Sequence, residues 1–158
     1  MDLNVNFDAD WGRGACNVRE TGPENYIGPN PNSEPEVRAL VDFTLRVKPK
    51  ITVAYHSKGE VIYHGFEPSS GSAIKERLER DYCLAKKIGE ITGYVPVKTE
   101  NSTGGYSDWV SMHLGIPALT IEVGNDDLAH PIGTDKLPEI LAQNKEVPGF
   151  LLEYLAVD

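Results

Sequence analysis

Two near-continuous apolar runs, at 51–56 and 117–123, dominate the hydrophobic pattern of the chain. Runs of this length are typical of strands that are covered on both faces of a sheet. Shorter stretches at 60–64 and 94–98 predict two further strands. The pattern therefore predicts a sheet with a buried centre.

The start of the chain shows a different pattern, in which Leu3, Val5 and Phe7 alternate with polar residues. Strict alternation predicts a strand with one buried face. The polar side holds Asn4 and Asn6, although Asn is depleted in strands because its amide competes for backbone hydrogen bonds. Two such residues suggest a special role for this segment.

Apolar residues at helical spacing predict helices over 33–48, 72–91 and 104–115, and a last helical region from 134 onward that breaks at Pro148. Ser33 and Glu36 form a capping-box pattern at the start of the first helix. Residues 8–32, rich in Gly and Pro, predict a long loop, and loops of this length are often functional. Because strands alternate with helices, we expect one α/β domain with a largely parallel sheet.

Composition narrows the classes of function. The chain has 158 residues and a formal charge of −9, which argues against nucleic acid and anionic membranes as partners, because both bind basic patches. No apolar run approaches the ~18 residues of a membrane span, and the N-terminus lacks a signal-peptide pattern. Cys16 and Cys83 fit neither a metal-binding spacing nor a disulfide framework, which leaves the redox compartment open.

Two buried strands end in ionisable side chains, His56 and Glu122. Ligands of open α/β sheets bind beyond the carboxyl ends of the strands, so this pair predicts metal-assisted or general-base hydrolysis. A single His at a strand end is also a common structural residue. A Glu inside an apolar strand is harder to explain without a function, because buried carboxylates are rare unless they are paired.

Several blocks along the chain resemble the zinc metallocarboxypeptidase family. They are, in order, "DLNVNFDADWG", "NYIGPNPNSEPEVRALVDF", "AYHS" and "GGYSDWVSMHLGIPALTIEVG". The segments "NVNFDADW" and "YHSKGEVIY" are most similar to those of the bacterial branch that cuts γ-D-glutamyl–diaminopimelate bonds in cell-wall peptides. The resemblance implies a three-layer α/β/α fold with a mainly parallel mixed sheet, a zinc cofactor and a peptide substrate. It leaves open whether the protein acts in the bacterial cytoplasm or is exported.

The resemblance also implies roles for individual residues. His56 matches a zinc ligand, and Glu122 matches the carboxylate that activates the zinc-bound water and carries its proton to the leaving amine. Asn4 matches an Asn that helps to hold the substrate's terminal carboxylate. Ser57 and Lys58, which follow His56 directly, are further candidates for contacts with the substrate, although Lys58 reads equally well as a solvated loop lysine.

Three features of the chain depart from the family pattern: two single positions and one missing motif. Val5 stands where the family carries an Arg that binds the substrate's terminal carboxylate through two parallel hydrogen bonds. This difference puts ordinary carboxypeptidase specificity in doubt. Glu100 stands near the place of the family's catalytic-pocket Tyr. The family's first two zinc ligands come from a His-x-x-Glu motif upstream of the Asn-rich block, and the single literal match, His64 to Glu67, comes after His56 and in the wrong order.

We therefore interpret residues 1–158 as the C-terminal portion of a zinc carboxypeptidase-like catalytic domain, with an incomplete zinc site and no activity alone. A missing N-terminal part would leave a strand edge exposed, so we expect a homodimer through that edge. Two alternatives remain: a metal-free binding or assembly module that keeps the fold, and a related zinc deacylase. The coding sequence immediately upstream separates the metal-free module from the peptidase.

Overall fold

The computed structural model describes residues 1–69 and 75–157. Its strands form one open sheet in the order β1-β4-β2-β3. They are β1 (Thr52–His56), β2 (Val61–His64), β3 (Val95–Lys98) and β4 (Ala118–Glu122). The pairs β1–β4 and β2–β3 are parallel, and β2–β4 is antiparallel. The predicted α/β class with a mainly parallel mixed sheet is confirmed.

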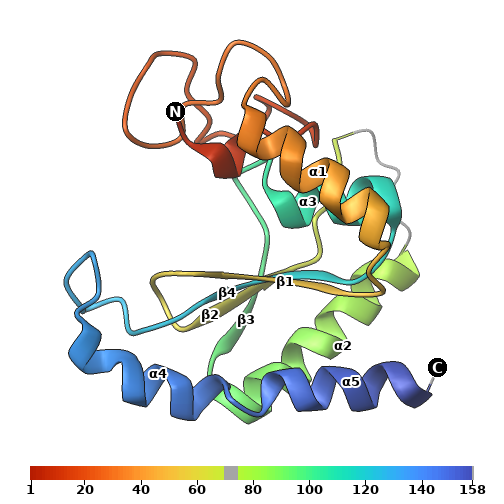
Figure 1. The fold of residues 1–158 in the computed structure, drawn as a ribbon, viewed down its shortest axis with the longest axis vertical. Coiled ribbons are helices and arrows are strands. Elements are labelled where there is room, and N and C mark those ends of the chain that lie inside the picture. The colour runs from red at the N-terminus through yellow and green to blue at the C-terminus, as the bar shows by residue number, and fades with distance from the viewer. Residues whose placement is uncertain (70–74, 158) are drawn as a thin grey trace.

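Helices cover both faces of this sheet and complete the three layers (Figure 1). One face carries α1 (Pro35–Val47) and α3 (Tyr106–Leu114), together with the long N-terminal loop. The other face carries α2 (Lys75–Thr92), α4 (Leu137–Asn144) and α5 (Val147–Val157). Two 3-10 helices, η1 (Leu3–Val5) and η2 (Thr134–Lys136), complete the described elements.

The sheet separates two apolar cores. The core beneath it is the larger and joins β2 and β4 to α2 and α5; its buried members are Ile62, Leu84, Ala85, Ile88, Tyr94, Leu119, Ile121 and Val147. The core above it joins the N-terminal segment to α1 and α3 through Phe7, Ala9, Val37, Trp109, Val110 and Ala118. The residues that line the candidate site lie on the face of the sheet that this second core covers.

The first segment is not a strand, so this prediction was wrong. Residues Leu3–Val5 form the 3-10 helix η1, because the Asp2 carboxylate accepts a hydrogen bond from the Asn4 backbone N–H at 3.0 Å and stabilises the turn. Val5 and Phe7 are buried as the alternation predicted, but Leu3 is 41% exposed.

Two predicted helix boundaries also need correction. No capping box forms at the start of α1, where Glu34 is the N-cap, because the Ser33 hydroxyl instead donates to Glu34 Oε1 and accepts from Asn6. The last helical region breaks before Pro148, which lies in the first turn of α5, where its missing N–H is not needed. The predicted start of the second helix, at 72–74, lies outside the described residues.

Strand β1 is an edge strand, which the apolar run did not predict. Within the described residues it pairs only with β4, and Tyr55 is 48% exposed on it. Only β4 has the buried centre that both runs predicted, with Leu119 and Ile121 fully buried. The free edge of β1 is therefore available for pairing with another polypeptide.

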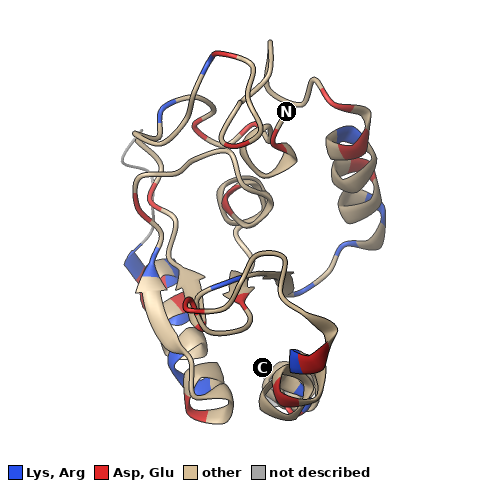
Figure 2. Ribbon diagram, turned by 90° about the vertical axis from the view of Figure 1, so that its left-hand side faces the viewer, with Lys and Arg blue, Asp and Glu red and all other residues tan. Residues whose placement is uncertain are grey.

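Charged residues of both signs are interspersed on the helices in Figure 2 rather than separated into a basic and an acidic segment. None of the described helices is long and apolar enough to span a lipid bilayer.

Candidate active site

His56 and Glu122 end adjacent strands and are direct partners in the parallel register of β1 and β4. Register partners in a parallel pair point to the same face of the sheet, which here is the face of η1 and α3, because both side chains line hollows together with residues of these two helices. The Val123 N–H donates to the His56 carbonyl at 2.9 Å, and this bond continues the ladder past both side chains. The structure therefore brings together the two residues that the sequence singled out.

Partial burial favours the neutral forms of both His56 and Glu122. Desolvation lowers the pKa of His56 below its ordinary value, and the charge of Asp2 opposes this shift. Desolvation raises the pKa of the Glu122 carboxyl, which makes it a better proton acceptor. A neutral imidazole is the form that coordinates a metal ion, and a carboxylate of raised pKa is suited to general-base chemistry.

The loops that follow these two strand ends are tied to each other. The Gly59 N–H donates to the Gly124 carbonyl at 2.8 Å, and the Lys58 ammonium lies 3.1 Å from Asp126 Oδ1. Ser57 is exposed and lines neither hollow described below. Substrate contact by Ser57 and Lys58 stays a prediction, and Lys58 would have to leave Asp126 to make it.

Helix η1 places Asn4 opposite the strand ends, and Asn6 holds η1 in place. The Asn6 amide, fully buried, donates to the Ile27 carbonyl at 2.8 Å, and to the Asn30 carbonyl and Ser33 Oγ at 3.0 Å each. Its oxygen accepts from the Glu34 N–H at 3.2 Å. The two asparagines therefore have different roles: Asn4 faces the site, and Asn6 joins the long loop to the start of α1.

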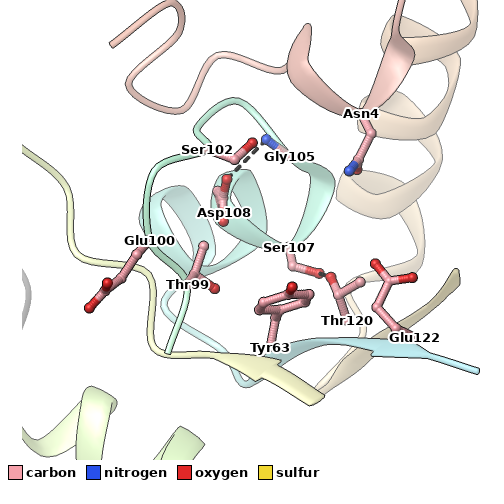
Figure 3. A pocket seen from close by; sticks show the side chains of 10 residues that line it. All are labelled: Asn4, Tyr63, Thr99, Glu100, Ser102, Gly105, Ser107, Asp108, Thr120 and Glu122. Carbon is pink, nitrogen blue, oxygen red and sulfur yellow. Dashed lines mark hydrogen bonds between the residues drawn. The ribbon is translucent and has the colours of Figure 1, made fainter. Parts of the chain in front are cut away.

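A polar pocket of about 220 Å³ opens beside Glu122 (Figure 3). Its lining comes from η1, β2, β4, the start of α3 and the loop before it: Asn4, Tyr63, Thr99, Glu100, Ser102, Gly105, Ser107, Asp108, Thr120 and Glu122. Figure 3 shows Glu122 at one side of the pocket and Glu100 at the opposite side. A substrate group held here would lie next to the candidate general base.

A second hollow of about 270 Å³ lies on the other side of Asn4 and contains His56. Its walls are mostly apolar and come from η1 and the residues after it, α1, β1 and the start of α3, with Glu36 as its only carboxylate among the described residues. Asn4 lines both hollows and thus stands between the surroundings of His56 and those of Glu122.

Most of the polar pocket was not found from sequence. One signal was available: Thr120 lies two residues before Glu122 and therefore shares its face of the strand. The Ser107 hydroxyl lies 2.9 Å from the Thr120 hydroxyl, but no sequence pattern links α3 to β4 in this way. Asp108, only 7% exposed, was likewise invisible as a lining residue.

The departures from the family pattern are distributed unevenly around the site. Glu100 does line the polar pocket, whereas the Val5 side chain is 2% exposed and lines neither hollow. His64 packs against Tyr82 on the opposite face of the sheet, and Glu67 pairs with Lys98. Neither His64 nor Glu67 lines either of the two hollows.

The donor set for a metal is partial. Across residues 1–69 and 75–157, no group of three or more His, Cys, Asp and Glu side chains is arranged to hold an ion. His56 fits the role of one donor, because it is half-buried, shifted toward its neutral form and open to a hollow. A catalytic zinc needs about three protein ligands, so the described residues provide an incomplete set.

Asp108 gives a prediction for the pH dependence of stability. Burial raises the pKa of this carboxyl to about 6, although the Gly105 N–H bond lowers it and Asp10 adds to the rise. A raised pKa means that the folded state binds the proton more tightly, so this contribution is complete below pH ~3.8 and lost above ~6. The shift corresponds to about 3 kcal/mol.

Asp108→Asn, which is neutral at every pH, should remove this slope. The free energy of unfolding of the variant minus that of the wild type should rise by about 2–3 kcal/mol between pH 4 and pH 7. Urea unfolding of both proteins at the two pH values measures this difference. A pH-independent difference would show that Asp108 titrates normally in the folded state.

Comparison with known proteins decides the family. A family model for zinc carboxypeptidases matches residues 1–146. The chain belongs to this family. Its zinc carboxypeptidase relatives include γ-D-glutamyl-L-diamino acid endopeptidase 1 of Lysinibacillus sphaericus, 33% identical over 143 residues, which cover 87% of this chain and 32% of the relative. Mouse carboxypeptidase A2 is 30% identical over 129 residues, covering 73% of this chain and 30% of that protein.

A solved structure shares the fold. Bovine thrombin-activatable fibrinolysis inhibitor, in complex with tick carboxypeptidase inhibitor, superposes with a TM-score of 0.75 at 25% identity, over 89% of this chain and 52% of that one. The resemblance seen in the sequence and the expected fold are thus confirmed. The chain spans about a third of the length of the curated relatives that it matches.

Proposed function

We propose that this chain is part of a zinc-dependent peptidase that hydrolyses amide bonds in cell-wall-derived γ-D-glutamyl–diaminopimelate peptides. The observation that carries the proposal is the pairing of His56 with Glu122 at the ends of adjacent strands, beside a polar pocket. Family membership supports hydrolysis of peptide bonds as the chemistry.

Three residues of this chain have roles in the proposed reaction. His56 would hold the zinc, which when bound polarises the scissile carbonyl and acidifies a water molecule. Glu122 takes a proton from the attacking water and then donates it to the leaving amine, for which its raised pKa is suited. Asn4, exposed between the two hollows, contacts the substrate.

The choice of substrate rests on a relative and on two positions in this chain. The Lysinibacillus sphaericus relative is named for cutting γ-D-glutamyl bonds to diamino acids. Val5 is buried and uncharged, and Glu100 carries a negative charge, so neither position offers a donor to a free terminal carboxylate. We infer that groups of the substrate other than that carboxylate contribute most to its recognition.

The test is turnover by the full-length protein, with the upstream part of the domain present. Zinc-loaded protein should cleave a γ-D-glutamyl–diaminopimelate dipeptide, and a chelator should abolish cleavage while readded zinc restores it. Activity that survives complete metal removal would contradict the proposed mechanism. Cleavage of N-acyl amino acids in preference to the dipeptide would favour a deacylase.

The 158-residue chain alone should have no peptidase activity and weak zinc affinity. One ligand cannot fix a tetrahedral site, and without bound metal Glu122 has no acidified water to activate. The free edge of β1 should also promote self-association, in the simplest case a two-fold dimer. Metal analysis after dialysis and light scattering measure both. Stoichiometric, chelator-resistant zinc in a strictly monomeric sample would contradict this prediction.

A further inference from the structure

Both loops that follow the candidate catalytic side chains border helix α4. One loop, from 57 to 60, follows His56, and the other begins directly after Glu122. The two side chains point toward η1 and α3, whereas α4 lies on the opposite face of the sheet (Figure 1). A small cavity of about 110 Å³ lies between α4 and the loops, and Glu60 and Gln143 are among its lining residues. The proposed reaction gives this cavity no role.

Glu60 joins the two loops to α4. Its Oε1 accepts a hydrogen bond from Gln143 Nε2 of α4 at 3.3 Å, and its Oε2 accepts a longer one from Asn125 Nδ2 at 3.5 Å. The Glu60 backbone carbonyl accepts from the Val95 N–H at 3.0 Å, at the start of β3. Because one carboxylate accepts from both sides, it fixes the loop after β1 relative to the loop after β4 and fixes both relative to the helix.

The helix end of this chain of hydrogen bonds is firmly anchored. Gln143 Oε1 accepts from the Tyr94 hydroxyl at 2.8 Å, and Asn144 Nδ2 donates to the same hydroxyl at 3.1 Å. Tyr94 belongs to the apolar core beneath the sheet and is only 3% exposed. The orientation of the Gln143 amide is therefore set from the core, with its Nε2 directed at Glu60.

The backbone at Glu60 supports a specific role for its side chain. Its φ of 51° lies in the left-handed region, which a residue with a Cβ adopts at a cost and which glycine adopts freely. A glycine here would relieve that cost but would remove the carboxylate that Gln143 and Asn125 share. Strain of this kind persists where the surrounding contacts compensate for it.

The two loops lie close to the side chains of the proposed reaction. The Gly59 N–H donates to the Gly124 carbonyl at 2.8 Å, and a Cβ on Gly59 would lie 3.9 Å from Glu122 Cβ. A shift of either loop would therefore move the base of Glu122 or the strand end that carries His56. Misplacement of a reacting group by about 1 Å is enough to slow a reaction severely.

We propose that Glu60 is a positioning residue of the candidate active site, which holds the loops after His56 and Glu122 against α4 through Gln143 and Asn125. The inference rests on the proposed function for its effect on catalysis, whereas the coupling of the loops is a property of the fold. Glu60 is not among the described residues that line either hollow of the site, so it acts only through the loops.

The first experiment measures the loops and needs no turnover. The Gly59 amide exchanges its hydrogen when its bond to Gly124 opens. In the full-length protein labelled with ¹⁵N-glycine, Glu60→Gln should raise the exchange rate of this amide at least about fivefold, the ratio expected from one lost hydrogen bond. The Gly115 amide, at the end of α3, is the reference in the same spectrum, and its rate should not change.

A swap of the two side chains tests the pairing itself. Gln143→Glu places two carboxylates opposite each other and should also raise the Gly59 rate. In the double variant Glu60→Gln/Gln143→Glu, the amide at position 60 donates to the carboxylate at 143 and still accepts from Asn125, and that carboxylate still accepts from Tyr94. The double variant should therefore return the Gly59 rate to within about twofold of the wild type.

Glu139→Gln is the matched control. Glu139 also belongs to α4 and lines the same cavity, but its one polar contact among the described residues is with Lys136, at 3.9 Å. Loss of this charge should leave the Gly59 rate and kcat unchanged. The proposal would be overturned by an unchanged Gly59 rate in Glu60→Gln, by an equal rise in Glu139→Gln or at Gly115, or by a double variant that does not restore the rate.

Turnover tests the consequence for catalysis. In the zinc-loaded full-length protein, Glu60→Gln should lower kcat on the γ-D-glutamyl–diaminopimelate dipeptide about tenfold and leave KM within about twofold, because Glu60 does not contact the substrate. The double variant should restore kcat. Full kcat in Glu60→Gln would overturn the positioning role. An inactive wild-type protein would instead contradict the proposed function, and the exchange rates would still support or overturn the coupling through Glu60.

Discussion

Replacing Glu122 by Gln in the full-length protein should lower kcat by about 10²–10⁴-fold, the usual contribution of a general acid–base group. The amide keeps the shape of the side chain but cannot take a proton from water. Single-turnover hydrolysis of a γ-D-glutamyl dipeptide measures the effect. Wild-type-like turnover would show that Glu122 does not carry the proton.

This loss should occur without unfolding. The Glu122 side chain makes no hydrogen bond to a described residue, and burial raises its pKa, so a neutral isostere costs the folded state nothing above the ordinary pKa of Glu. Thermal unfolding and zinc content should therefore match those of the wild type. Glu153→Gln, on the exposed surface of α5, provides the control for the loss of one charge and should keep full activity.

Replacing Asn6 should have the largest effect on stability. Asn6→Asp keeps the size of the side chain but removes both amide donors that face Ile27 O, Asn30 O and Ser33 Oγ, and brings a negative charge to these acceptors. We expect a loss of about 2–4 kcal/mol in the free energy of unfolding, because buried acceptors would lose their partner. Urea unfolding measures it.

The neighbouring asparagine is the matched control. Asn4→Asp introduces the same change two residues earlier, at an exposed position whose side chain makes no hydrogen bond within the described residues. Its stability should stay within about 0.5 kcal/mol of the wild type, whereas substrate affinity of the full-length enzyme should fall. Equal destabilisation by both substitutions would mean that Asn6 has no special structural role.

Local sequence patterns were sufficient to predict most of the helices and strands. The apolar runs identified β1 and β4, and Gly115 in the left-handed conformation ends α3 where the Gly-bounded pattern placed its end. His56 and Glu122 could be predicted as a pair because strand ends of a parallel sheet meet at one edge. Each of these inferences depends on residues close together in the chain, where period and spacing carry the information.

Tertiary contacts decided the rest. Alternation alone could not distinguish a strand from η1, because the choice depends on the Asp2 cap and on contacts of Asn6 with residues more than 20 positions away. The edge position of β1 depends on which strands are available to pair, and that is a property of the whole sheet. The pocket around Asp108 arises where η1, α3 and two strands meet, so its lining exists only after long-range packing has brought those segments together.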